Sequence, residues 1–151
     1  MKGEGTKDRP NVNHLLDNIC MNGQYLPISN LPITAISVTP VVAGYVSVNV
    51  DMLKKNNIHD IVFTAGSGVV GTAGMVVYLW DIADATVYGQ ILFSSGENNI
   101  IKSTSVKIYI IPKTGTLNFR TTANKGSTVG TSCTLNSSGI NFYNKLPGTN
   151  I

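Results

Sequence analysis

Charged residues are scarce in this sequence, and acidic ones are missing from its C-terminal third. Only 13% of the 151 residues are charged, against an average of about 25%. All eight Asp and Glu residues lie at or before Glu97, whereas basic residues continue as far as Lys145. Because acid–base catalysis and the binding of hard metal ions usually rely on carboxylates, residues 98–151 are a poor place for either.

Cysteine and histidine are also rare. Cys20 and Cys133 lie far apart, and neither has a second Cys or His at a metal-binding spacing. We expect two unpaired thiols in buried or half-buried positions, with a disulfide as the alternative. His14 and His59 are the only histidines. His59 is followed by Asp60, but neighbouring strand residues point to opposite faces, so these two do not form a catalytic pair.

Long hydrophobic runs are missing. No window of about 18 apolar residues is present, which predicts no transmembrane segment. The polar start, MKGEGTKDRPNVN, lacks the apolar centre of a secretory signal. We therefore expect a chain that is made and folded in a cytoplasm. The glycosylation pattern Asn136-Ser137-Ser138 is interpreted as a turn.

Neutral polar residues replace the missing charge: 16 Asn, 15 Thr and 12 Ser. Such residues suit surfaces that contact other protein, because a buried hydroxyl or amide is satisfied more easily than a buried charge. An extracellular β-protein with a Ser/Thr-rich exposed face fits the composition equally well. Lys107 and Arg120 alternate with apolar neighbours, as on the solvated face of a sheet. We therefore expect no nucleic-acid partner.

Alternation with a period of two dominates from Ile33 onward. Val46, Val48 and Val50 share one face of a predicted strand. Further strands are expected at 58–64, 75–80, 86–93, 104–111, 117–120, 128–135 and 140–143. The run 75–80 is almost continuously apolar, which is typical of a strand buried on both faces. Residues 51–57 interrupt the pattern as a loop or a single helical turn.

About eight strands separated by turn signals predict an all-β fold, an antiparallel β-sandwich of jelly-roll type. A seven-stranded immunoglobulin sandwich is disfavoured because its Cys…Trp…Cys spacing is absent. Residues 1–32 form a separate N-terminal arm or anchor, and residues 33–151 the sandwich domain. In the arm, residues 14–20 could form two helical turns, and Pro27 and Pro32 keep the chain extended.

One motif suggests a nucleotide. Residues 66–71 match G-x-G-x-x-G after a predicted strand, as in dinucleotide-binding folds. The helix that must follow is missing, because residues 69–82 contain glycines and a β-branched, aromatic run that favours a strand. The motif is therefore interpreted as a flexible hairpin loop, and no cofactor is expected.

Two further groups were weighed as sites. Asp51, Asp81 and Asp84 could bind Ca²⁺ at loop ends, but Asp81 and Asp84 flank a predicted turn, which explains them better. No metal and no catalytic residue is therefore assigned. Five aromatic residues could stack on sugars: Tyr78, Trp80, Tyr88, Tyr109 and Tyr143. Trp80 lies in the most apolar run and is expected in the core, so Tyr109 beside Lys107 is the better surface candidate.

In organisation, though through no shared motif, the chain resembles small accessory virion proteins of bacteriophages, of the capsid-decoration or head-fibre type. The resemblance lies in the polar arm of residues 1–32 followed by the charge-poor β-domain of residues 33–151. It implies a non-enzymatic virion component, a homo-oligomer with a trimer favoured, and an arm that binds a capsid or tail protein. It also implies no cofactor. The alternative is a lectin-like module that binds a host-surface glycan.

Overall fold

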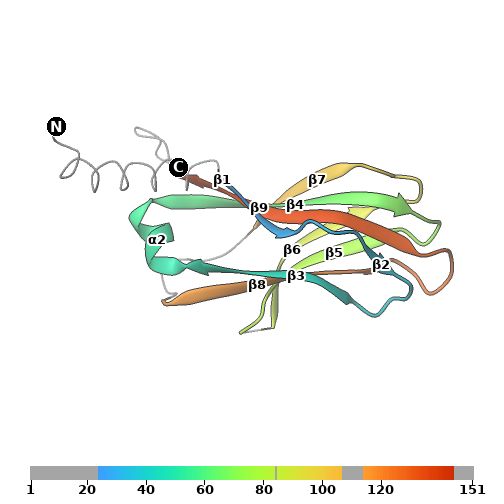
Figure 1. Ribbon diagram of the computed structural model, residues 1–151, viewed down its shortest axis with the longest axis horizontal. Coiled ribbons are helices and arrows are strands. Elements are labelled where there is room, and N and C mark those ends of the chain that lie inside the picture. Colours follow the sequence, from blue (N-terminus) through green and yellow to red (C-terminus); the bar gives the residue numbers. More distant parts are fainter. Residues whose placement is uncertain (1–23, 84, 107–113, 145–151) are drawn as a thin grey trace.

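Two antiparallel sheets stack face to face in the computed structural model, which describes residues 24–83, 85–106 and 114–144 (Figure 1). The elements are β1 (Gln24–Ser29), β2 (Ile33–Ala35), β3 (Val41–Asn49), α2 (Val50–Lys55), β4 (Ile58–Val70), β5 (Met75–Asp81), β6 (Thr86–Phe93), β7 (Ile101–Val106), β8 (Thr116–Lys125) and β9 (Cys133–Asn144). Sheet A has the order β1-β9-β4-β7, with β2 also paired to β9, and sheet B the order β3-β8-β5-β6.

The pairing of the strands is that of one long hairpin rolled into a sandwich. β5 pairs with β6, β4 with β7, β3 with β8, and β1 and β2 both pair with β9. Nested antiparallel pairs of this kind define a jelly roll. The predicted antiparallel β-sandwich of jelly-roll type is therefore confirmed. The strand predicted over 86–93 coincides with β6.

The sandwich begins earlier than the predicted boundary at residue 33. Residues 24–29, assigned above to the arm, form β1 and pair with β9. Pro27 is compatible with this position because β1 lies at the edge of sheet A, where a missing N–H is tolerated. Ile28 is buried in the core. Residues 1–23, with the predicted helix, His14 and Cys20, lie outside the described residues, so that part of the arm remains a prediction.

Two predicted breaks in the strands are absent. β4 continues to Val70 and includes most of the glycine motif, and β9 runs through the turn predicted at residues 136–138. The strands pass each other closely at these points: a Cβ on Gly66 would lie 2.7 Å from Ser137 Oγ, and one on Gly68 would lie 2.7 Å from Asn136 Oδ1. Glycine here permits packing between strands.

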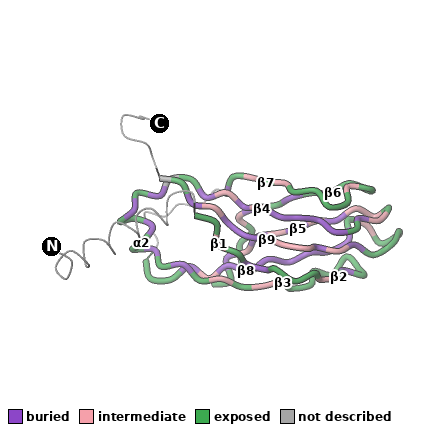
Figure 2. Tube along the Cα trace, turned by 45° about the horizontal axis from the view of Figure 1, so that its top comes forward, coloured by how far each residue is buried: buried purple, intermediate pink, exposed green. Residues whose placement is uncertain are grey.

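The core lies between the sheets and is closed at one end by α2. Phe63, Phe119 and Phe142 are among its fully buried side chains, and Figure 2 shows buried positions along the central strands and exposed ones along β3. The side chain of Asn49 caps α2 by accepting a hydrogen bond from the Met52 N–H (3.2 Å). Of the two alternatives left open for residues 51–57, a loop or a single helical turn, the structure has the helical turn. No helix within the described residues is long and apolar enough to cross a bilayer.

Candidate functional site

The outer face of sheet B carries the most distinctive group of side chains. Along β5, buried positions alternate with half-buried ones, and Tyr78 and Trp80 belong to the half-buried, outward set. The prediction that this strand is buried on both faces, with Trp80 in the core, is therefore wrong. Because the outward side chains of β5 are also apolar, the alternation of buried and exposed positions could not be recognised in the sequence.

Three adjacent strands place these side chains beside one another. In the register of sheet B, Tyr45 on β3 lies opposite Arg120 on β8, and Arg120 lies opposite Trp80 on β5. The next outward pair is Thr122 with Tyr78. We call Tyr45, Tyr78, Trp80, Arg120 and Thr122 the aromatic face. Because sheet positions fix all five Cα atoms, the face is rigid at the level of the backbone.

The rings of the aromatic face are held in place by direct contacts. The Trp80 indole N–H donates to Thr122 Oγ1 over 2.8 Å, which fixes the orientation of the ring. The Tyr78 and Trp80 ring centroids are 5.7 Å apart at 53°, within the usual range for aromatic pairs. The guanidinium carbon of Arg120 lies 5.4 Å from the centroid of Trp80, a cation–π distance. Tyr45, by contrast, is 61% exposed.

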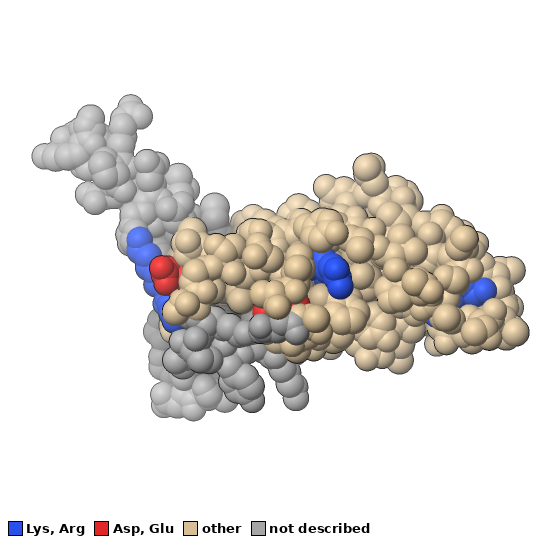
Figure 3. All heavy atoms as spheres, turned by 90° about the horizontal axis from the view of Figure 1, so that it is seen from below, with Lys and Arg blue, Asp and Glu red and all other residues tan. Residues whose placement is uncertain are grey.

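The charge of Arg120 has no carboxylate partner among the residues that the structure describes. Its Nε atom is buried and makes no hydrogen bond there. Asp81 follows Trp80 directly, but it is buried, and its carboxylate accepts hydrogen bonds from Tyr88 Oη and the Ala83 N–H, both at 3.0 Å. Seen from the side of sheet B, acidic and basic groups gather near α2, and most of the remaining described surface is uncharged (Figure 3).

The structure separates the five aromatic residues weighed above. Tyr88 contacts the core edge-on, with its ring 6.3 Å from that of Phe119, and Tyr143 lies on sheet A. Tyr109 and Lys107 lie outside the described residues. Among the four of these residues that the structure describes, only Tyr78 and Trp80 share a face. Sequence reasoning missed Tyr45 and the role of Arg120, and the available signal was the alternation along β3 and β8.

The acidic and histidine candidates do not form a site in the described part of the chain. Asp51 is exposed on α2, and Asp81 is buried at the β5–β6 turn, where its bond to Ala83 N–H confirms the turn interpretation. Asp84 and the side chain of His59 lie outside the described residues. No group of three metal-binding side chains occurs within the described ranges.

The remaining motifs have structural explanations. The glycine motif lies in β4 up to Val70, and a turn then leads to β5 in the other sheet. No helix follows the motif, so the helix of a nucleotide site is absent there, and residues 66–70 form a strand where a hairpin loop was predicted. Cys133 is buried and free, with Sγ 3.8 Å from the Ala35 carbonyl oxygen. Burial raises the pKa of its thiol, and Lys125 partly opposes this rise. The predicted buried thiol is confirmed for Cys133.

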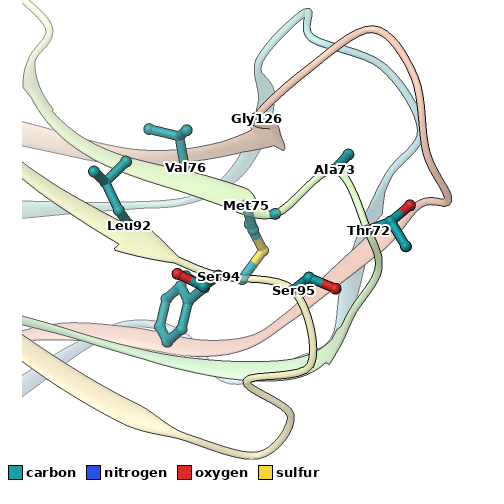
Figure 4. Close-up of a pocket in the computed structure, with 10 residues that line it drawn as sticks. Thr72, Ala73, Met75, Val76, Leu92, Ser94, Ser95 and Gly126 are labelled. Carbon is teal, nitrogen blue, oxygen red and sulfur yellow. The ribbon is translucent and has the colours of Figure 1, made fainter.

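A shallow depression of about 390 Å³ opens at the end of the sandwich opposite α2 (Figure 4). The turn before β5 and the segment after β6 line it, with Thr72, Met75, Leu92, Ser95 and Gly126 among its residues. No charged side chain lines it, and Figure 4 shows small polar and apolar groups around an open mouth. Nothing in this lining specifies a ligand.

No family model matches the chain, and no curated protein matches it in sequence. Three similar solved structures are a Cellvibrio mixtus lichenase 5A carbohydrate-binding module with cellotriose, the infectious bursal disease virus VP2 subviral particle, and a Bacillus subtilis family 43 arabinoxylan arabinofuranohydrolase with cellotetraose. Their identities are 16%, 9% and 14%, their TM-scores 0.39, 0.43 and 0.40. The matches cover 80%, 80% and 82% of this chain and 71%, 31% and 25% of those chains. With TM-scores below 0.5, these similarities carry no functional argument.

Proposed function

We propose that this chain is a non-enzymatic assembly protein, an accessory component of a virion that associates with further copies of itself. The observation that carries the proposal is an exposed apolar edge without charge. Its residues are Leu31, Ile36, Val38, Val41 and Val42, which we call the apolar edge; Leu31 and Ile36 are 78% and 74% exposed. No charged residue occurs between Asp17 and Asp51 in the sequence.

The position of the apolar edge favours a protein partner. The apolar edge lies along β2, β3 and the loops beside them, and β3 is an edge strand of sheet B. Proteins usually protect the edges of sheets with charged side chains. Several exposed apolar side chains near an edge that lacks them favour an interaction site. A second copy of the chain is the partner that symmetry makes simplest, because one surface then serves every subunit. A trimer remains the favoured state.

The role in a virion rests on the arm. Residues 1–23 precede β1, so their removal leaves every strand of the sandwich intact in sequence. We propose that this segment binds a capsid or tail protein. In particles that contain the chain, removal of residues 1–23 should abolish incorporation while the isolated protein keeps its β-rich circular dichroism spectrum. Undiminished incorporation would rule out anchoring by the arm.

The oligomeric state tests the apolar edge directly. Ile36→Lys places a charge in the edge, and Val129→Lys is the matched control, because Val129 is also 74% exposed but lies in the loop between β8 and β9. We expect native mass measurements to give an oligomer for the unaltered chain and for Val129→Lys, and a monomer for Ile36→Lys. A monomeric unaltered chain at micromolar concentration would contradict the proposal.

A second candidate function is glycan binding through the aromatic face. It is favoured by one observation: Trp80 is fixed by its bond to Thr122 while Tyr45, in the same row, is largely exposed. Sugars stack on aromatic rings that are held in place and surrounded by polar groups. Trp80→Ala should then remove binding to a glycan array without changing the oligomeric mass.

A further inference from the structure

We propose that the aromatic face selects a saccharide that bears a carboxylate, with Arg120 as the group that binds the acid. This inference rests on the glycan-binding function proposed above and names the class of sugar. It goes beyond that function because stacking alone recognises neutral and acidic sugars alike. The added element is the charge of Arg120 and its place in the row between Tyr45 and Trp80.

Arg120 is suited to an external anion because nothing in the described structure neutralises it. A half-buried cation normally has a charged or polar partner. On the same sandwich, Lys102 binds Glu97 at 2.8 Å and Lys125 donates to the Gly130 carbonyl oxygen at 2.8 Å. Arg120 instead rests on the ring of Trp80 at 5.4 Å. The nearest carboxylate along β5, that of Asp81, is engaged on the inner side by Tyr88 and Ala83.

The geometry of the guanidinium favours a carboxylate. Arginine presents a planar set of N–H donors that matches the two oxygens of a carboxylate. The aromatic neighbours offer stacking surfaces for the sugar ring. Beside the row, Ser47 Oγ donates to Asn118 Oδ1 over 2.6 Å, so the surroundings are neutral and polar, as sugar hydroxyls require.

Nucleic acid is a poorer occupant of this face. Phosphate backbones are bound by several cations along a track, whereas Arg120 is the only basic residue of the aromatic face. A purely apolar protein partner is also disfavoured, since it would bury an uncompensated guanidinium. A single guanidinium beside aromatic rings suits a sugar ring that carries one carboxylate.

The sequence supplies a probe at the site itself, because Trp80 is the only tryptophan. Its fluorescence and its indole N–H resonance therefore report on the aromatic face alone. The full chain is titrated with the methyl glycosides of sialic acid and glucuronic acid, and with the same glycosides after reduction of the carboxylate to an alcohol. Arg120→Gln removes the charge, and Lys55→Gln, on exposed α2, is the control with the same change in net charge.

We expect at least one acidic glycoside to bind about 10- to 100-fold more tightly than its alcohol, the range expected for charge-assisted hydrogen bonds. Arg120→Gln should abolish this preference, and Lys55→Gln should keep it. Equal affinity for acid and alcohol would overturn the inference and leave glycan binding standing. If none of the four glycosides moves the Trp80 signals, and a glycan array is also silent, both the inference and the glycan-binding function fail.

Discussion

The two outer faces of the sandwich are built from the same neutral residues but differ in what they leave unsatisfied. On sheet A the side chains satisfy one another: Thr64 and Ser103 share a hydroxyl hydrogen bond of 2.8 Å, and the Tyr25 ring lies over Gly139, where a Cβ would collide with it. On sheet B, the guanidinium of Arg120 lies over the Trp80 ring with no carboxylate partner among the described residues, and Tyr45 extends into solvent.

The outer face of a sheet can be covered by side chains of the sheet itself or left exposed to solvent. Glycine at position 139 leaves room for the Tyr25 ring, so this side chain of β1 covers the neighbouring strand β9. Burial raises the pKa of the Tyr25 hydroxyl, as expected for a phenol that rests on protein. The open face is therefore the one on which an external partner gains most.

The largest effect on stability is expected from Gly139→Val. The new side chain would displace the far end of the Tyr25 ring, which can rotate toward solvent. The cost is then the lost burial of this ring, about 1–2 kcal/mol. Urea unfolding should show the loss. Adding Tyr25→Ala removes the obstructing ring, so the double variant should lose less than the sum of the two single losses. Strict additivity would show that Tyr25 does not occupy this space.

A smaller effect on stability is expected when threonine is replaced by valine, once on each face. Thr122→Val removes the acceptor of the Trp80 indole N–H and should cost about 1–2 kcal/mol, because a partly buried donor is left unsatisfied. Thr64→Val removes an exposed hydroxyl pair on sheet A and should cost less than about 0.5 kcal/mol. Thermal unfolding measures both. Equal losses would mean that the bond to Trp80 does not order the aromatic face.

The smallest expected effect on stability comes from the ion pair between Lys102 of sheet A and Glu97. Hydrogen bonds from Lys102 Nζ and then from the Ser94 N–H hold the pKa of Glu97 below its ordinary value. Because the folded-state pKa is the lower one, the unfolded chain binds the proton more readily. The contribution is present above the unfolded pKa and is lost as pH falls through the folded one, which lies below the ordinary range of a glutamate.

Glu97→Gln should therefore reduce, slightly, the loss of thermal stability on acidification, and Arg120→Gln should leave that pH dependence unchanged. Melting curves recorded across this pH range check both. An Arg120→Gln variant with an altered acid profile would indicate a carboxylate partner for Arg120 and would remove the contrast between the two faces.

Three segments show which parts of the structure could be predicted from the sequence and which could not. Thr86–Phe93 was predicted correctly because hydrophobic alternation and turn signals agree there. Residues 24–29 were missed because Pro27 argues against a strand unless the strand is known to lie at an edge. Trp80 was misplaced because apolar residues on both sides of β5 look the same whether the outer face is covered or open.

The sequence alone determined the fold class, the weight of neutral polar residues and the lack of acid after Glu97, because period and composition are local properties of the chain. Only the tertiary structure decided that Tyr45, Arg120 and Trp80 form one row. They come from three strands far apart in sequence. Their meeting depends on strand order and register, which side-chain pairing across the whole sandwich fixes and no short stretch of sequence encodes.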